Sequence, residues 1–218
     1  MSVNNTKRSI FIWDVHWCYE ELKLLIKQLH LTENDTVYFV WDLINKWPKS
    51  WKVLKLVFKN RDQYKCVLWN HEINFLRWLD SGLYDWDTTG FEKLKEKLEE
   101  NWEILDYLRS LPLYIEKKNF ILLHWWLIPG KDLSYHSADE ITRMREYNGK
   151  PWYDYYTWEK RIIYGHWALN GLRFKNNTIC LDTGCVYGKA LTAYILETWE
   201  IIQQQALDIY VNLYKKVC

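Results

Sequence analysis

The chain has unusually little glycine. Glycine ordinarily makes up about 7% of a protein, or about 15 residues in a chain of this length, whereas these 218 residues include eight glycines and 15 tryptophans. Glycine is the residue that turns with positive φ, and close approaches between backbones, ordinarily require. The chain must therefore form such features with bulkier residues, and tryptophan is the residue in excess.

Paired cysteines, a charge excess and long apolar runs are also missing. The five cysteines are odd in number and show no CxxC spacing, so we expect reduced thiols and no disulfide framework. Lysine plus arginine number 29 against 28 for aspartate plus glutamate, and with no long-range field we expect no nucleic-acid partner. No apolar run is long enough to cross a membrane, and residues 1–7 lack the apolar core of a signal peptide. We therefore expect a cytoplasmic protein without a membrane partner.

Apolar runs and amphipathic segments alternate along the first third of the chain. The runs at 10–12, 36–40 and 64–68 predict buried strands, and the spacing of apolar residues over 19–30 predicts a helix. A second helix is expected from Ser50 onward. Strand–helix–strand–helix–strand in so short a stretch favours parallel strands joined by right-handed crossovers, and hence an α/β fold.

The rest of the chain is predicted to contain a helical insertion and a strand-rich last third. The insertion covers about 72–111, where 91–111 is charged with helix-like spacing of apolar residues, and Ser137 with Glu140 forms a capping box that opens a later helix. No linker or repeat is visible, so we expect one domain over residues 1–218. Further strands are predicted at 113–116, 119–123, 161–164, 178–182, 191–196 and 200–210.

Potential metal ligands follow several predicted strands, at the point where each strand becomes a loop. The carboxyl ends of parallel strands lie along one edge of a sheet, and sites form there. The set has two carboxylates, one amide oxygen, three imidazoles and no thiolate, which suits two divalent ions, with manganese as the first choice and iron, cobalt or zinc as alternatives. Its members are Asp14, His16, Asp42, Asn70, His124 and His166.

Other residues near these ligands fit roles in phosphoryl chemistry. Asp42 is the natural bridge between two ions because a carboxylate has two oxygens, and two ions about 3.5–4 Å apart can hold a hydroxide for attack on phosphorus. His71 lies beside Asn70 and can protonate the leaving oxygen, since an unperturbed imidazole has a pKa of about 6.5. The cations expected to bind phosphate oxygens are Lys46, Arg143 and Arg145.

Five ordered motifs give the sequence a resemblance to a known family. In chain order they are D-x-H, D-L-I-N-K-x-P, N-H-E, L-H and G-H, and they resemble the motifs of the calcineurin-like metallophosphoesterases, within the phosphoprotein phosphatase branch. The downstream segments 141–145, 164–172 and 181–196 are similar to the symmetrical diadenosine tetraphosphatases. The resemblance covers nearly the whole chain.

The resemblance implies a fold, a reaction and a role for each candidate residue. The implied fold is an α/β sandwich of two mixed sheets flanked by helices. The implied reaction is metal-dependent cleavage of a small nucleotide or phosphoester substrate, first of all diadenosine tetraphosphate to two ADP, with His71 as general acid. A protein Ser/Thr phosphatase or general phosphomonoesterase is the alternative. The implied ligands are Asp14, His16 and Asp42 for the first metal, and Asp42, Asn70, His124 and His166 for the second.

The sequence departs from the family at its glycines. Trp158 and Trp199 occupy places where a turn favours glycine. A bulky residue forced into a left-handed conformation costs roughly 1–2 kcal/mol, and overpacking costs about 1–3 kcal/mol. Two further readings follow: a non-catalytic homologue whose indoles block the metal cleft, and an aromatic platform that stacks bases or sugars. Tryptophan stands in the place of a motif glycine at Trp13, Trp17, Trp41, Trp47, Trp69, Trp125 and Trp126.

Two polar residues depart from the family motifs, and two histidines lie outside every motif. Lys46 occupies the place of a phosphate-binding arginine, so it keeps the charge and loses the bidentate fork. Asn45 stands where some family members carry an aspartate that orients the acid. His30 and His136 match no motif, and we expect them to be surface or capping residues.

Overall fold

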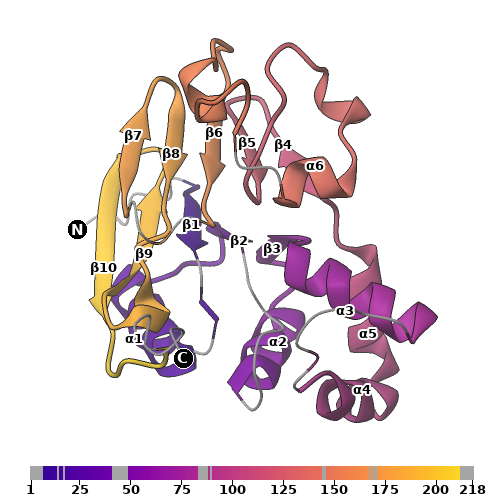
Figure 1. The fold of residues 1–218 in the computed structure, drawn as a ribbon. Coiled ribbons are helices and arrows are strands. Elements are labelled where there is room, and N and C mark those ends of the chain that lie inside the picture. The colour runs from indigo at the N-terminus through magenta and orange to yellow at the C-terminus, as the bar shows by residue number, and fades with distance from the viewer. Residues whose placement is uncertain are drawn as a thin grey trace.

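Two five-stranded mixed sheets form the centre of the computed structural model, which describes residues 7–13, 15–16, 18–40, 49–82, 88, 90–143, 146–166, 168 and 171–211 (Figure 1). The first sheet runs in the order β10 (Glu200–Gln205), β9 (Ala190–Ile195), β1 (Ser9–Trp13), β2 (Thr36–Val40) and β3 (Tyr64–Val67). The second runs in the order β4 (Tyr114–Glu116), β5 (Phe120–Leu123), β6 (Arg161–Tyr164), β8 (Thr178–Cys180) and β7 (Arg173–Lys175). The predicted sandwich of two mixed sheets flanked by helices is confirmed.

The central strand β1 is buried on both faces. Side chains alternate between the two faces of a strand, so Ile10 and Ile12 belong to the core under the helices, whereas Phe11 and Trp13 belong to the core between the sheets. β1 pairs in parallel with β2 and antiparallel with β9. This double burial explains why the strand reads as a continuous apolar run in the sequence.

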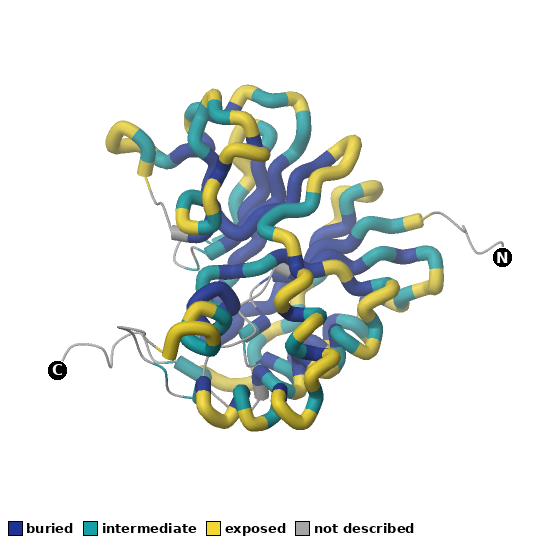
Figure 2. Tube along the Cα trace, turned by 90° about the vertical axis from the view of Figure 1, so that its right-hand side faces the viewer, coloured by how far each residue is buried: buried dark blue, intermediate teal, exposed yellow. Residues whose placement is uncertain are grey.

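The helices cover the outer face of the first sheet and one end of the second. They are α1 (Tyr19–Leu29), α2 (Lys49–Lys59), α3 (Asn70–Ser81), α4 (Phe91–Glu99), α5 (Trp102–Ser110) and α6 (Ala138–Arg143). Leu22, Val53, Leu94 and Leu108 bring α1, α2, α4 and α5 to the core of the first sheet, and Ile141 brings α6 to the core between the sheets. Figure 2 shows the buried chain enclosed by exposed loops and helix surfaces. Within the described ranges, no helix has the length and apolar character needed to span a bilayer.

Two predicted strands extend too far, and the predicted helical segment 91–111 is divided in two. The last strand ends at Gln205 and not at residue 210, because Leu207 N and Tyr210 Oη donate to the Glu21 carboxylate of α1 at 2.9 and 2.7 Å and turn the chain away from the sheet. The strand predicted at 178–182 stops at Cys180. The segment 91–111 forms two helices, since the Asn101 side chain donates to the carbonyl of Lys97 and ends α4. The short strand β7 was not predicted.

The predicted capping box before α6 is confirmed. The backbone N–H of Ser137 donates to Glu140 Oε2 at 2.7 Å, and the N–H of Glu140 donates to Ser137 Oγ at 3.3 Å. The two side chains thereby satisfy donors that the first turn of a helix leaves open. Three short 3-10 helices complete the described elements, η1 (Leu133–Tyr135), η2 (Trp152–Asp154) and η4 (Cys185–Tyr187).

An ion pair joins the start of β1 to the turn before β2. Arg8 Nε and Nη2 donate to the Asp35 carboxylate at 2.9 and 2.6 Å, and Nη2 also donates to the carbonyl of Leu29 at the end of α1. Burial alone would raise the pKa of Asp35, but the hydrogen bonds from Arg8 and Thr32 outweigh it and lower that pKa to about 2. The pair therefore anchors the parallel register in which Ser9 faces Thr36.

Replacing Arg8 with methionine is expected to lower the free energy of unfolding by about 3 kcal/mol at pH 7, because Asp35 would stay buried without its cation. The folded pKa of Asp35 lies below its ordinary value of 3.8, so the stabilisation is present above about pH 4 and is lost as the pH falls through about 2. Urea unfolding at pH 7 and at acidic pH measures both effects. Lys23→Met, which removes the exposed pair with Glu20, should change stability by less than about 0.5 kcal/mol. Equal stability of the two variants at pH 7 would contradict the assignment.

Candidate functional site

The carboxyl ends of parallel strands from both sheets converge at one place. Trp13 at the end of β1 faces Val40 at the end of β2, which faces Val67 at the end of β3. In the second sheet, β5 and β6 are also parallel, and the N–H of Gly165 after β6 donates to the carbonyl of His124 after β5 at 3.1 Å. The segments that follow β1, β3, β5 and β6 therefore come together although they are far apart in the sequence.

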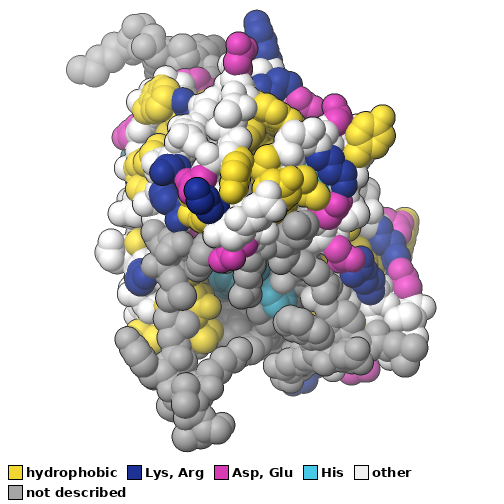
Figure 3. All heavy atoms as spheres, turned by 45° about the horizontal axis from the view of Figure 1, so that its top comes forward, with side chains coloured by type: hydrophobic (Ala, Val, Ile, Leu, Met, Phe, Trp, Pro, Cys, Tyr) yellow, Lys and Arg dark blue, Asp and Glu magenta, His cyan; other side chains and the backbone are white. Residues whose placement is uncertain are grey.

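Four histidines gather at this convergence. The rings of His124 and His166 meet edge to face with 4.5 Å between their centroids. His16 and His71 lie close enough to influence the charge of His124. Histidine side chains are visible near the middle of one face of the molecule in Figure 3. The structure thus brings together four of the sequence-predicted site histidines.

Burial keeps two of these imidazoles neutral. Loss of solvent lowers the pKa of His124 well below its ordinary value of 6.5, and the neighbouring His166, His71 and His16 lower it further. Burial, followed by the effect of His71 and His166, lowers the pKa of His16 to about 3. Neutral imidazole is the form that binds metal ions.

Buried polar atoms at the convergence lack hydrogen-bond partners. Both ring nitrogens of His124 and the Oδ1 atom of Asn70 are buried and have no hydrogen-bond partner among the residues that the structure describes. An unsatisfied buried polar group costs about 1–3 kcal/mol, so native proteins rarely keep one without a reason. Imidazole nitrogen and amide oxygen are ordinary ligands for divalent cations. A metal ion would satisfy these atoms, and His124 and Asn70 fit such a site.

Indole rings crowd the same histidines. The ring centroid of Trp69 lies 3.8 Å from that of His124, and Trp125 lies 5.3 Å from His166. Of the histidines 16, 71, 124 and 166, all within the described ranges, no three bring ring nitrogens within 4.8 Å of one another. These four histidines therefore lie close together without three of them forming a compact set of ligand atoms.

Gly165 is the glycine of the G-H motif, and its place in the sequence assigned it no role of its own. An added Cβ at Gly165 would lie 1.2 Å from Nε1 of Trp13, so the indole rests directly on this backbone. Next to it, His166 has a φ of +73°, and His16 a φ of +42°. Non-glycine residues in this left-handed region are uncommon and cluster at functional sites. The sequence signal for Gly165 is the G-H motif, which it forms with His166.

Several predicted residues lie outside the described part of the chain. Arg143 is the last residue of α6, and its side chain is not among those described. The other predicted residues outside the described part are Asp14, Asp42, Lys46 and Arg145, together with Trp17, Trp41 and Trp47. The roles proposed for all of these residues stay predictions.

A different cluster meets the distance expected of metal ligands. The ligand atoms of Cys18, Glu21 and Cys185 all lie within 4.8 Å of one another and are buried. One oxygen of Glu21 already accepts hydrogen bonds from Leu207 and Tyr210, which fastens the segment after β10 to α1. These contacts give Oε1 of Glu21 a structural role, whereas Oε2 is buried without a hydrogen-bond partner among the described residues.

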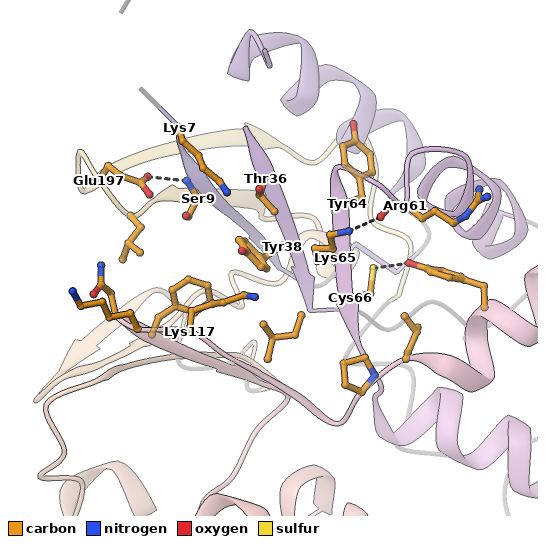
Figure 4. A pocket seen from close by; sticks show the side chains of 18 residues that line it. Lys7, Ser9, Thr36, Tyr38, Arg61, Tyr64, Lys65, Cys66, Lys117 and Glu197 are labelled. Atoms are coloured by element: carbon orange, nitrogen blue, oxygen red, sulfur yellow. Dashed lines mark hydrogen bonds between the residues drawn. The ribbon is translucent and has the colours of Figure 1, made fainter. Parts of the chain in front are cut away.

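A basic groove lies at the opposite ends of the strands. Its volume is about 720 Å³, and its lining includes Ser9, Thr36 and Tyr64, where β1, β2 and β3 begin (Figure 4). Five cations and one carboxylate line it: Lys7, Arg61, Lys65, Lys117, Lys118 and Glu197. The carboxylate accepts from Ser9 N at 2.8 Å. Because parallel strands begin here and end at the histidines, this groove is separate from the predicted metal site.

Comparison with known proteins supports the resemblance inferred from the motifs. No family model matches the chain. The sequence is 25% identical to the symmetrical bis(5'-nucleosyl)-tetraphosphatase of Neisseria meningitidis, over 89% of this chain and 94% of that protein. It is also 25% identical to the protein of the same name from Vibrio parahaemolyticus, over 90% of this chain and 98% of that protein. The predicted similarity to this group is confirmed, and so is the expectation of an enzyme.

Solved structures agree with the sequence comparison. A protein provisionally assigned as a diadenosine tetraphosphatase is similar with a TM-score of 0.79 and 28% identity, over 94% of this chain and 96% of that one. A metallophosphoesterase from Sphaerobacter thermophilus shares the fold with a TM-score of 0.58 and 14% identity, over 91% of this chain and 87% of that one.

His136 provides a matched contrast to His124. We expected a surface or capping residue; it is buried, and it follows η1 directly as its C-cap. Its Nε2 accepts from the N–H of Ile128 at 2.8 Å, and its Nδ1 lies 3.0 Å from the carbonyl of Asp132. Both nitrogens of His136 are therefore satisfied by the backbone, unlike those of His124.

Replacing His124 with leucine is expected to raise the free energy of unfolding of the metal-free protein by about 1–3 kcal/mol, because two unsatisfied buried nitrogens disappear. The same change should abolish most of the stabilisation that added Mn²⁺ confers. Thermal unfolding with and without Mn²⁺ measures both effects. His136→Leu should instead destabilise the protein and keep the response to metal. If His124→Leu destabilised the metal-free protein as much as His136→Leu, the site assignment would be wrong.

Proposed function

We propose that this chain, which resembles metallophosphoesterases in sequence and fold, is a metal-dependent hydrolase of dinucleoside polyphosphates. Its preferred reaction would be cleavage of diadenosine tetraphosphate to two ADP. The observation that carries the proposal is the set of buried, unbonded ligand atoms of His124 and Asn70 at the convergence of strand ends. The similarity to proteins named symmetrical bis(5'-nucleosyl)-tetraphosphatases supports the substrate.

The proposed metal ligands come from both sheets. His16 and Asn70 follow strands of the first sheet, and His124 and His166 follow strands of the second. Asp14 and Asp42 would complete the set, and Asp42, whose carboxylate has two oxygens, would serve both ions. When bound, two divalent ions supply positive charge for a phosphoryl group and lower the pKa of water. We propose manganese as the native metal, with iron, cobalt or zinc as alternatives, since oxygen and imidazole ligands without thiolate suit these ions.

The chain's own residues would bind, orient and protonate the substrate. His71 is the second residue of α3, directly after the proposed ligand Asn70, and it would donate a proton to the leaving phosphate oxygen. Lys46, Arg143 and Arg145 would hold phosphate oxygens through charge-assisted hydrogen bonds. The short spacing between Asn70 and His71 would place the proton donor beside the metal ligand.

The reaction is proposed to take place in the cytoplasm. The four described cysteines Cys18, Cys66, Cys180 and Cys185 are buried free thiols. Burial raises the pKa of both Cys66 and Cys180 to about 12, so these thiols stay protonated and unreactive. This pattern suits a reducing compartment.

The substrate proposal predicts a specific product pattern. Purified protein supplied with Mn²⁺ should convert diadenosine tetraphosphate to ADP alone, because symmetrical cleavage leaves two phosphates on each nucleoside. Chromatography of the nucleotides measures the products. Release of ATP with AMP, or faster hydrolysis of a phosphopeptide or p-nitrophenyl phosphate, would contradict the proposal and favour a general phosphatase.

Replacing His71 with asparagine is expected to lower kcat by about 10²–10⁴-fold and to leave two metal equivalents bound, because the imidazole would act on the proton and not on the ions. Asp42→Asn should lower turnover and also weaken both metals. Steady-state kinetics and elemental analysis distinguish the two effects. His30→Asn is the matched control, since His30 is the exposed C-cap of α1 and belongs to none of the motifs. Loss of metal from His71→Asn would show that His71 is a ligand.

A further inference from the structure

We infer that several tryptophans of this chain occupy positions built for glycine, and that the protein made in its own cells carries glycine there. The positions are 13, 69, 125, 126 and 199. The inferred cause is that those cells read one triplet, UGA, as glycine. A code that reads UGA as tryptophan would yield the sequence with tryptophan at these positions. This inference does not depend on which phosphoester the enzyme cleaves.

The backbone conformation of Trp199 supports the inference. It ends the turn between β9 and β10, where its N–H donates to the carbonyl of Ile195, and its φ is +62°. A bulky residue with positive φ is an outlier, while glycine adopts this conformation freely. The other described non-glycine residues with positive φ are histidines and asparagines, so Trp199 is the largest side chain among them.

The packing around Trp13 and Trp69 also supports the inference that these positions are built for glycine. Nε1 of Trp13 lies where a Cβ of Gly165 would be, and the ring of Trp69 lies 3.8 Å from the ring of His124. Both indole N–H groups are buried without an acceptor, as is that of Trp126. Buried tryptophan ordinarily finds a partner for this donor, so neither space nor hydrogen bonding suits an indole at these positions.

Position along the chain supports the same conclusion. Trp69 precedes Asn70, and Trp125 and Trp126 follow His124, so these indoles flank proposed metal ligands. The chain has eight glycines, whereas about 15 would be usual for its length. A single change in the reading of one codon accounts for a shortage of glycine and an excess of tryptophan together.

Other tryptophans fit their positions and should be retained. Trp102 opens α5 with its side chain 64% exposed. Trp152 opens η2 and meets the rings of Tyr153, Tyr156 and Tyr164 edge to face. Its indole N–H is buried without an acceptor among the described residues, as in Trp13, Trp69 and Trp126, so its ring packing and not its hydrogen bonding sets it apart. The inference therefore predicts two classes of tryptophan, and the two codons UGA and UGG can distinguish them.

The first test is the gene together with the mass of the native protein. Codons 13, 69, 125, 126 and 199 should be UGA, and codons 102 and 152 should be UGG. Peptide mass spectrometry of protein from its own cells should find glycine at each UGA position. UGG codons at the first five positions, or tryptophan in their peptides, would overturn the inference. Neither readout requires activity, so failure of the proposed function would leave this result intact.

The second test measures whether the fold prefers glycine, with alanine as the reference. Trp199→Gly should melt about 2–4 °C above Trp199→Ala, because both lose the indole and its stacking with Arg161, but only glycine relaxes the positive φ. At Trp102 the order should reverse, with the glycine variant about 2–4 °C below the alanine variant, because glycine weakens a helix. A Trp199→Gly variant that melts no higher than Trp199→Ala would refute the structural argument.

Discussion

The burial of β1 on both faces is the constraint on which the rest of the structure depends. One face of β1 is covered by helices and the other by the second sheet, so the strand has no freedom to slide or tilt. Its neighbour β2 is held in parallel register from the first residue pair by the Arg8–Asp35 contact. Fixed strands deliver their last residues to fixed places, and the site is assembled from the loops that follow. The fold therefore determines where the chemistry can be.

The contrast between two buried histidines separates structure from function. His136 has both nitrogens bonded to backbone atoms and so contributes to stability. His124 is buried more completely and has neither nitrogen bonded, which is a net cost to the folded state. Proteins tolerate such costs mainly where a ligand removes them. The same residue type thus has opposite consequences, and the difference comes from the neighbouring backbone and not from the sequence.

Local patterns predicted most elements, and contacts between distant residues decided the rest. The periodicity of apolar residues located β1, α1, β2 and β3, because each element buries its own face. The end of β10 was missed because Glu21, more than 180 residues away, holds the segment that follows. The motifs predicted which histidines meet, since strand ends must converge. They did not predict the spacing of the rings, because that depends on how large side chains such as Trp69 fill the space between the sheets.

Fold and site make different demands on the residues where they meet. The core between the sheets requires apolar volume, and the buried indoles of Trp13, Trp69 and Trp126 supply it, so the sandwich closes around them. A metal site requires the opposite, namely ligand atoms that face one another across space that no side chain fills. An indole that supplies apolar volume to the core therefore fills space that the metal site requires to be open. Crowding at the histidines is therefore compatible with a well-formed fold, and the loss falls on the geometry of the ligands, where glycine would leave the backbone in place and free the volume of the ring.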